Sequence, residues 1–301
     1  MESAEANAFR IAVGCAIALG CLGPPACGSE ADGVGSVGTS DASADAADSG
    51  ADASPDVGPD VDASLADADA ALDAFVDGCP PEMVRIDAFC VDRWEAHVVE
   101  LGQDGSELTH SPYLVIPDGV SIRAKSAEAV VPQGYISQLQ ATEACENAGK
   151  RLCDAAEFVL ACRGIDANDY YPYGGQTHEP GACNEGKGSA VALFHGSDPS
   201  LWTYDDFNDP ALNMWDGGLA LTGEFTECVS PFGVHDCVGN LHEWGSDAPD
   251  PKGHGRFRGG FYGDAEYNGH GCLYVTSAHA PSYHDYSTGF RCCRDAEGLP
   301  P

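Results

Sequence analysis

Eleven cysteines are scattered over the part of this 301-residue chain that follows residue 78. They include no paired CxxC motifs with the spacing that binds zinc. So many scattered cysteines indicate disulfides, which form and persist in oxidising compartments. We therefore expect an exported, cross-linked domain. Because eleven is an odd number, one thiol is left over, and we assign it to one of the adjacent residues Cys292 and Cys293.

The first 27 residues have the features of an export signal. Residues 11–22 form an apolar run after Arg10 that is too short to cross a bilayer as a helix. A small residue directly precedes both Cys21 and Cys27, which suggests lipoprotein processing at one of them. Plain signal cleavage without a lipid, and an N-terminus that is not cleaved, are the alternatives.

Residues 28–77 are predicted to be a disordered linker. They contain twelve Asp and one Glu, with no Lys or Arg. A segment of this composition has too little apolar surface to offset the entropy lost on ordering, and its like charges repel one another. We expect it to hold a domain spanning residues 78–299 away from a membrane, in the periplasm or at the cell surface.

The net charge of −34 excludes some partners. Nucleic acid is not expected to bind, because phosphate recognition depends on Lys and Arg. The headgroups of an anionic membrane would repel the domain as well. Contact with a membrane is therefore expected only through the lipid anchor.

Two helices are predicted by capping boxes, Ser-x-x-Gln at residues 137–140 and Asp-x-x-Glu at residues 154–157. The first helix should end near Ala148, before Gly149, and the second near Arg163. The rest of the domain is rich in Gly, Pro, Asn and Asp, which indicates short strands joined by long loops.

Five motifs in this domain occur in the order found in one known family. They are the strand pair at residues 83–86 and 89–95, the helical motif at 148–164, Tyr-Pro-Tyr-Gly at 171–174, the block at 230–244 that ends in Gly-Asn-Leu-His-Glu-Trp, and the closing pieces at 258–260 and 289–292. Together they resemble the formylglycine-generating enzyme, or sulfatase-modifying factor, family. The resemblance implies an α+β, loop-rich fold related to C-type lectins.

The resemblance also implies disulfide pairs. Cys145 matches the position that bonds the cysteine of the closing motif, here Cys292, and Cys162 matches the partner of Cys272. Cys79 and Cys90 are a plausible local pair by their spacing. Four further cysteines could form two more bonds whose connectivity the sequence does not determine: Cys153, Cys183, Cys228 and Cys237.

Members of the family also carry calcium. The resemblance places a site at Asn240 and Glu243, with a carbonyl from Leu241, and a second site beginning at Asn184. Carboxylate, amide and carbonyl oxygens are ligands suited to this cation. The alternative is that these side chains bond only to the loop backbone.

Active members bind copper(I) through two cysteines that follow the closing Gly-Gly, and use it to oxidise a substrate cysteine. Here Asp264 stands at the first cysteine position, Asn268 or Gly269 stands near the second, and Phe261 replaces the usual Ser. Only Cys272 remains, and it is assigned to a disulfide. Because Cu(I) selects soft thiolates, we expect no copper and no formylglycine synthesis.

The sequence leaves three hypotheses open. We favour a non-catalytic binding or scaffold module for a peptide, glycan or protein partner. The alternatives are an oxidoreductase-type enzyme with a non-standard site and a structural envelope lipoprotein. A non-standard metal or acid-base site would draw on side chains near the closing motifs: Asp264, Glu266, His270, His279 and His284.

Overall fold

The computed structural model describes residues 78–297, which hold mixed helices and sheets linked by five disulfides. The predicted signal peptide, the lipidation sites Cys21 and Cys27, the linker over residues 28–77 and the last two residues of the predicted 78–299 domain lie outside the described residues. Between residues 78 and 297, every helix is too short or too polar to cross a membrane.

Both predicted helices are confirmed with their caps. In α2, the Ser137 hydroxyl accepts from the backbone N–H of Gln140, whose side chain accepts from the Ser137 N–H, and in α3 Asp154 and Glu157 exchange the same pair of bonds. The helices and helical turns are α2 (Gln138–Asn147), α3 (Ala155–Arg163), α4 (Ala190–His195), η1 (Pro199–Leu201), η2 (Asp206–Asn208), α5 (Ala211–Met214) and η3 (Gly271–Leu273).

The strands are short and form three sheets within the described residues, with strand orders β1-β2-β11-β6, β10-β7-β8-β9 and β4-β3-β5. Their bounds are β1 (Met83–Ile86), β2 (Phe89–Asp92), β3 (Ala96–Leu101), β4 (Glu107–Thr109), β5 (Ile122–Ser126), β6 (Arg151–Leu152), β7 (His242–Trp244), β8 (Phe257–Arg258), β9 (Val275–Thr276), β10 (Thr288–Phe290) and β11 (Cys292–Asp295).

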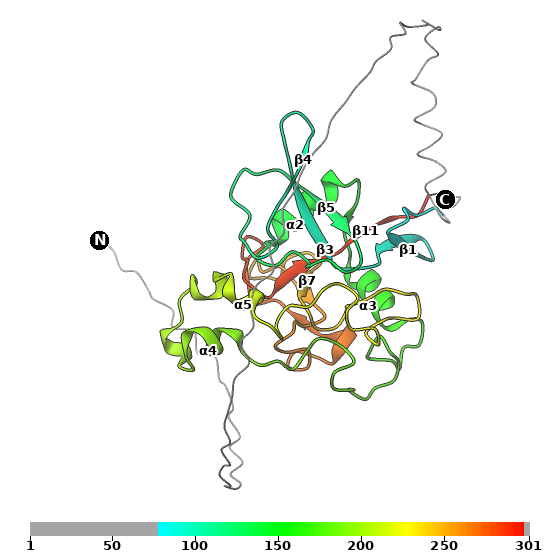
Figure 1. Ribbon diagram of the computed structural model, residues 1–301. Helices are drawn as coiled ribbons and strands as arrows, with labels where there is room; N and C mark the ends of the chain where they lie inside the picture. The colour runs from blue at the N-terminus through cyan, green and yellow to red at the C-terminus, as the bar shows by residue number, and fades with distance from the viewer. Residues whose placement is uncertain (1–77, 298–301) are drawn as a thin grey trace, which may run out of the picture. The chain divides into compact units, whose positions relative to one another are not determined.

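Strand β11 joins the two ends of the domain. It pairs antiparallel with β2 on one side and with β6 on the other (Figure 1). The strand pair β1–β2, predicted at residues 83–86 and 89–95, forms an antiparallel hairpin with Ile86 opposite Phe89. In the second sheet, β10 pairs with β7 in parallel, so that Gly289 lies opposite Glu243. The closing motif therefore lies beside the Gly-Asn-Leu-His-Glu-Trp block.

Two hydrophobic cores lie on opposite sides of β11. One contains Val91, Phe158 and Cys293, and the other contains Leu152, Trp244 and Cys292. Because successive side chains of a strand point to opposite faces, the adjacent cysteines of β11 enter different cores. A third cluster packs α4 and α5 against Tyr135 and Tyr262.

Candidate functional site

The disulfides decide which thiols are available for chemistry. The three expected pairs are formed: Cys79–Cys90, Cys145–Cys292 and Cys162–Cys272. Of the remaining pairs, one lies within the set of four cysteines left open and one does not. The structure bonds Cys153 to Cys293 and Cys183 to Cys228, which leaves Cys237 as the free cysteine among the described residues.

The assignment of the leftover thiol to Cys292 or Cys293 was therefore wrong, for a geometric reason. In the pairing of β11 with β6, Cys292 lies opposite Leu152 and Cys293 lies opposite Arg151. The two sulfurs point to opposite faces, where Cys145 and Cys153 lie at suitable distances. Adjacent cysteines on a strand can thus both be bonded.

The segment that carries the catalytic cysteines in active relatives folds here into a tight turn. Phe261 and Asp264 exchange backbone hydrogen bonds of 2.9 and 3.0 Å. One Asp264 carboxylate oxygen accepts from the backbone N–H groups of Glu266 and Tyr267, both at 3.1 Å. The Phe261 ring lies 4.8 Å from the His242 ring. Asp264 therefore stabilises the loop, and Phe261 fills space beside a buried histidine.

The Gly-Gly pair before this turn is required by packing. Both Gly259 and Gly260 have positive φ angles, of 78° and 76°. A Cβ atom at Gly259 would lie 2.4 Å from the Cys237 carbonyl oxygen, and one at Gly260 would lie 2.5 Å from the Cα of Ala265. Any larger residue would push the turn away from the core.

A chain of buried hydrogen-bonding groups lies behind the turn. His242 Nδ1 lies 3.1 Å from the Ser287 hydroxyl, which donates to Asp285, and His242 Nε2 lies 3.3 Å from the Tyr274 hydroxyl. Asn268, at the second degenerate position, donates to the same Tyr274 hydroxyl. Burial lowers the pKa of His242 to about 3. The imidazole is therefore neutral at pH 7, and it has no open path to substrate, because it is only 6% exposed.

Two of the residues expected to bind calcium, Asn240 and Glu243, form hydrogen bonds with protein groups. Asn240 Oδ1 accepts from Asn184 Nδ2 and from the backbone N–H of Ala220, both at 2.9 Å. Both carboxylate oxygens of Glu243 accept from Arg291, at 2.6 and 2.7 Å. In this arrangement the Asn240 amide oxygen already accepts two hydrogen bonds and the Glu243 carboxylate is paired with a cation, while calcium at Asn184, Asn240, Leu241 and Glu243 stays a prediction.

The Gly-Asn step in this block has a backbone explanation. Asn240 has a φ of 50°, in the left-handed region that Asn tolerates better than most residues. A Cβ atom at Gly239 would lie 2.2 Å from the Asn184 carbonyl oxygen. The motif is therefore accounted for by the close packing of two loops.

An excess of buried carboxylates surrounds Arg291. Glu95, Asp236 and Glu243 are all at most 4% exposed, and Arg291 is the nearest buried cation. Burial raises the pKa of Asp236 to about 7 and that of Glu95 well above its usual value. The cluster therefore takes up protons at a pH where surface carboxylates are ionised.

The histidines and acids near the closing motifs do not converge. His270 pairs with Glu266 at 2.7 Å on the surface, His279 stacks on Tyr283 at 3.7 Å, and His284 Nδ1 lies 2.8 Å from Asn208. Over residues 78–297, no group of three or more His, Cys, Asp or Glu side chains is arranged to hold a metal ion. A non-standard metal site made of these side chains is thus not formed here.

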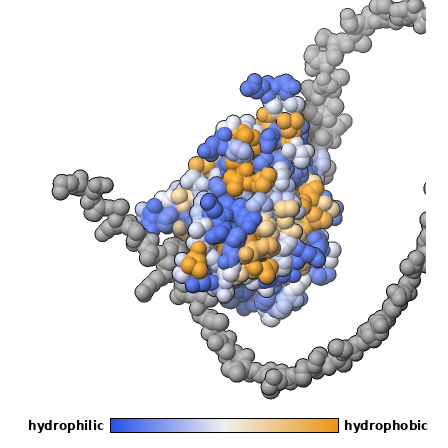
Figure 2. Space-filling model, turned by 60° about the vertical axis from the view of Figure 1, so that its left-hand side comes forward, coloured by the Kyte–Doolittle hydropathy of each residue, from blue (hydrophilic) through white to orange (hydrophobic). Residues whose placement is uncertain are grey.

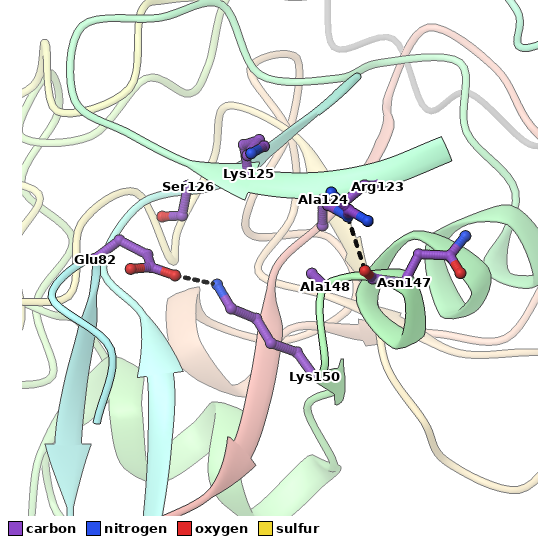
Figure 3. A pocket seen from close by; sticks show the side chains of 8 residues that line it. All are labelled: Glu82, Arg123, Ala124, Lys125, Ser126, Asn147, Ala148 and Lys150. Carbon is purple, nitrogen blue, oxygen red and sulfur yellow. Dashed lines mark hydrogen bonds and ion pairs between the residues drawn. The ribbon is translucent and has the colours of Figure 1, made fainter. Parts of the chain in front are cut away.

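A groove of about 540 Å³ lies elsewhere, between β5, the end of α2 and Lys150 (Figure 3). The ammonium of Lys150 lies 2.9 Å from Glu82 and 2.7 Å from Asp92, and Arg123 donates to the Asn147 carbonyl oxygen. Its lining includes none of the predicted site residues. Arg123 and Lys125, the other cations of the lining, both pair with Glu107, so each cation of the groove already has a carboxylate partner within the domain.

The sequence of this chain matches a known protein family over most of its length. The profile of a family described as "Sulfatase-modifying factor enzyme 1-like domain" matches residues 69–296. The chain belongs to this family. No curated protein matches it significantly.

Several solved structures are similar to this sulfatase-modifying-factor-like chain at a low level. The I1, U1 and M1 variants of a protein titled "Major Tropism Determinant" share 15% sequence identity with it and give TM-scores of 0.40. The alignments cover 72%, 73% and 73% of this chain and 53%, 54% and 54% of theirs. The chain thus spans about half the length of these structures.

The copper chemistry implied by the sulfatase-modifying factor family does not fit the residues present. Cys272 is bonded to Cys162, and Cys237 is a single thiol with 1% exposure. Burial raises the pKa of Cys237 to about 12, so its thiolate is not available near neutral pH. The described residues therefore contain no pair of thiolates for Cu(I).

Sequence reasoning missed three buried polar residues of this sulfatase-modifying-factor-like domain. Glu95 and Asp236 both lie inside the matched motifs, and His242 lies between two residues that were considered as ligands. Their positions were therefore visible, but their burial and their partners were not. Those depend on the packing of β7 and β10 against a loop more than a hundred residues away.

Proposed function

We propose that this domain is a non-catalytic binding module of the sulfatase-modifying factor family that works outside the cytosol. The observation that carries the proposal is the bond between Cys162 and Cys272, together with Asp264 at the first catalytic position. These features leave no thiolate pair for the reaction that active members perform. A family fold without its reactive groups is suited to recognition.

The disulfides support an extracytoplasmic location. Five bonds staple a domain whose strands have at most six residues, and such bonds persist in oxidising compartments. They fix the bases of long loops and so reduce the entropy that the loops would lose on binding a partner. Family membership supports a C-type-lectin-related arrangement of these loops.

The proposed anchor and linker would set the distance between the module and a membrane. A lipid on Cys21 or Cys27 would fix it to a membrane, and the acidic linker over residues 28–77 would hold it at a distance. A peptide, a glycan or a protein in the periplasm or at the cell surface is the proposed class of partner.

The competing function is an enzyme with a non-standard site. The hydrogen-bonded chain through Ser287, His242 and Tyr274 is the arrangement that most resembles a catalytic group. All three side chains are at most 6% exposed, so a substrate could not contact them without rearrangement. The geometry therefore favours binding.

A direct assay separates the two functions. The purified full chain is incubated with Cu(I), oxygen, a thiol reductant that supplies the other two electrons for the reduction of oxygen, and a cysteine-containing peptide of the sulfatase type, and the peptide is followed by mass spectrometry. We expect no conversion of the cysteine to formylglycine. Conversion that depends on copper would contradict the proposal, and metal analysis showing bound copper or iron would point to the enzyme.

A further inference from the structure

Bulky apolar side chains stand exposed on the segment between residues 190 and 221. Leu193 is 61% exposed, Leu201 72% and Met214 63%, and Phe194 is also exposed. The same elements bury other apolar residues, such as Val191 and Leu212, in the third core. The exposed side chains are therefore not the ones that pack this segment onto the domain.

These side chains belong to elements that pack on one another. Helix α4 contacts both α5 and η2. The indole N–H of Trp202, at the end of η1, donates to the Gly196 carbonyl oxygen at the end of α4, and the Trp202 ring packs edge-on against Phe207 of η2. Figure 1 shows α4 and α5 side by side at one side of the domain. In Figure 2, which turns this side forward, hydrophobic patches alternate with hydrophilic ones.

The charge around these side chains has one sign. Residues 190–221, the segment that carries these side chains, contain five Asp and no Glu, Lys or Arg. Asp198, Asp205 and Asp216 are exposed among the apolar residues. Two further carboxylates, Asp206 and Asp209, lie 3.2 and 3.1 Å from the nitrogens of His195, at the point where α4 ends.

We propose that the acidic apolar surface formed by Leu193, Phe194, Leu201 and Met214 binds an amphipathic polypeptide segment with Lys or Arg beside apolar side chains. Exposed apolar patches rimmed by charge are typical of recognition surfaces, and a cationic rim on the partner would complement the aspartates. The proposal deepens the binding function above and rests on it, because it names the class of partner.

Charge also favours this partner over other candidates for binding to the surface. A second copy of the chain would bring two sets of aspartates together, which opposes self-association. An anionic membrane would repel the same residues. A cationic amphipathic segment would cover the exposed leucines and would place positive charge beside the exposed aspartates.

The test uses the full chain and a labelled synthetic peptide of about 18 residues, built from Leu and Lys at helical spacing. Fluorescence anisotropy gives the Kd for the wild type and for the variant L193S/L201S. The matched control is L108S/I165S, which changes leucine and isoleucine residues that are 55% and 87% exposed elsewhere. Because both variants keep the acidic linker, any binding of the peptide to the linker is the same in each.

We expect L193S/L201S to raise the Kd by about tenfold or more, and L108S/I165S by less than about twofold. The variant D205N/D216N should weaken binding and reduce its dependence on NaCl between about 50 and about 300 mM. This charge variant keeps the test valid should L193S/L201S fail to fold, as judged by circular dichroism.

Four results would overturn the proposal. The first is equal loss of binding in L193S/L201S and its control. The second is tight binding of a Leu/Glu peptide of the same pattern. The third is a concentration-dependent dimer that L193S/L201S abolishes. The fourth is binding to phosphatidylcholine vesicles that the same variant abolishes. None of these results would restore a catalytic site, so the failure of this surface is distinct from the failure of the proposed function.

Discussion

Arg291 and Glu243 form a buried ion pair with two hydrogen bonds, of 2.6 and 2.7 Å, between the end of β10 and strand β7. Arg291 also donates to the carbonyl oxygens of Asp92 and His235, so one side chain links four segments. Both members of the pair are at most 2% exposed. Removing one partner leaves a buried charge without compensation, which is more costly than the pair itself is stabilising.

We therefore predict that R291M lowers the free energy of unfolding by about 3–5 kcal/mol, and that R291K, which lacks the planar fork, recovers only part of it. Urea denaturation followed by tryptophan fluorescence measures both. The matched control is the variant R151M. Arg151 contacts both oxygens of Glu157 at 2.6 and 2.7 Å, but its side chain is 40% exposed. R151M should cost about 1 kcal/mol or less. Equal losses in R291M and R151M would contradict the prediction.

The carboxylate of Asp236 makes stability depend on pH in an unusual direction. Burial raises its pKa from 3.8 to about 7, so the folded protein prefers the protonated form. Its contribution to stability is fully present below about pH 4 and is lost as the pH rises toward 7, with a slope of at most about 1.4 kcal/mol per pH unit. The variant D236N should remove this dependence. Its free energy of unfolding should exceed that of the wild type by an amount that grows from pH 4 to pH 7.

Melting temperatures of the wild type and D236N across this pH range test the prediction. A difference that does not change with pH would contradict it. So would a rise in the melting temperature of the wild type, but not of D236N, when calcium is added at pH 7. That result would mean that a cation, and not a proton, neutralises the cluster.

Asp264 is predicted to matter for the loop and not for chemistry. Its carboxylate accepts from two backbone N–H groups, in the way that a side chain caps a turn. D264A should lower the free energy of unfolding by about 1 kcal/mol, and D264N, which keeps one acceptor oxygen, by less. Chemical denaturation measures both changes. Equal losses in the two variants would show that the hydrogen bonds to the turn are not what Asp264 contributes.

Local features of the fold were predictable from the sequence because they depend on neighbouring residues. The capping boxes at Ser137 and Asp154 placed both helices within a residue of their observed ends. The family motifs placed the β1–β2 hairpin and matched the observed Cys145–Cys292 and Cys162–Cys272 bonds. Each of these features has a short sequence signal or a motif of its own.

What the sequence could not supply depends on strand register and on burial. The partner of Cys293 follows from the pairing of β11 with β6, which places Arg151 opposite it and Cys153 within reach. The bonding of Glu243 to Arg291 follows from the parallel pairing of β7 with β10. Neither pairing has a local signal, because the partners are separated by 140 and 48 residues.

The absence of a reactive thiol pair is tested most directly by counting thiols in the native and the unfolded protein. The purified chain is alkylated without reduction, first folded and then in denaturant, and the modified peptides are identified by mass spectrometry beside a Cu(I) competition assay. Between residues 78 and 297 we predict no alkylation in the folded protein, a single alkylated residue, Cys237, after unfolding, and no retained copper. Alkylation of Cys272 in the folded protein together with a second thiol, and tight binding of Cu(I) by that pair, would contradict it.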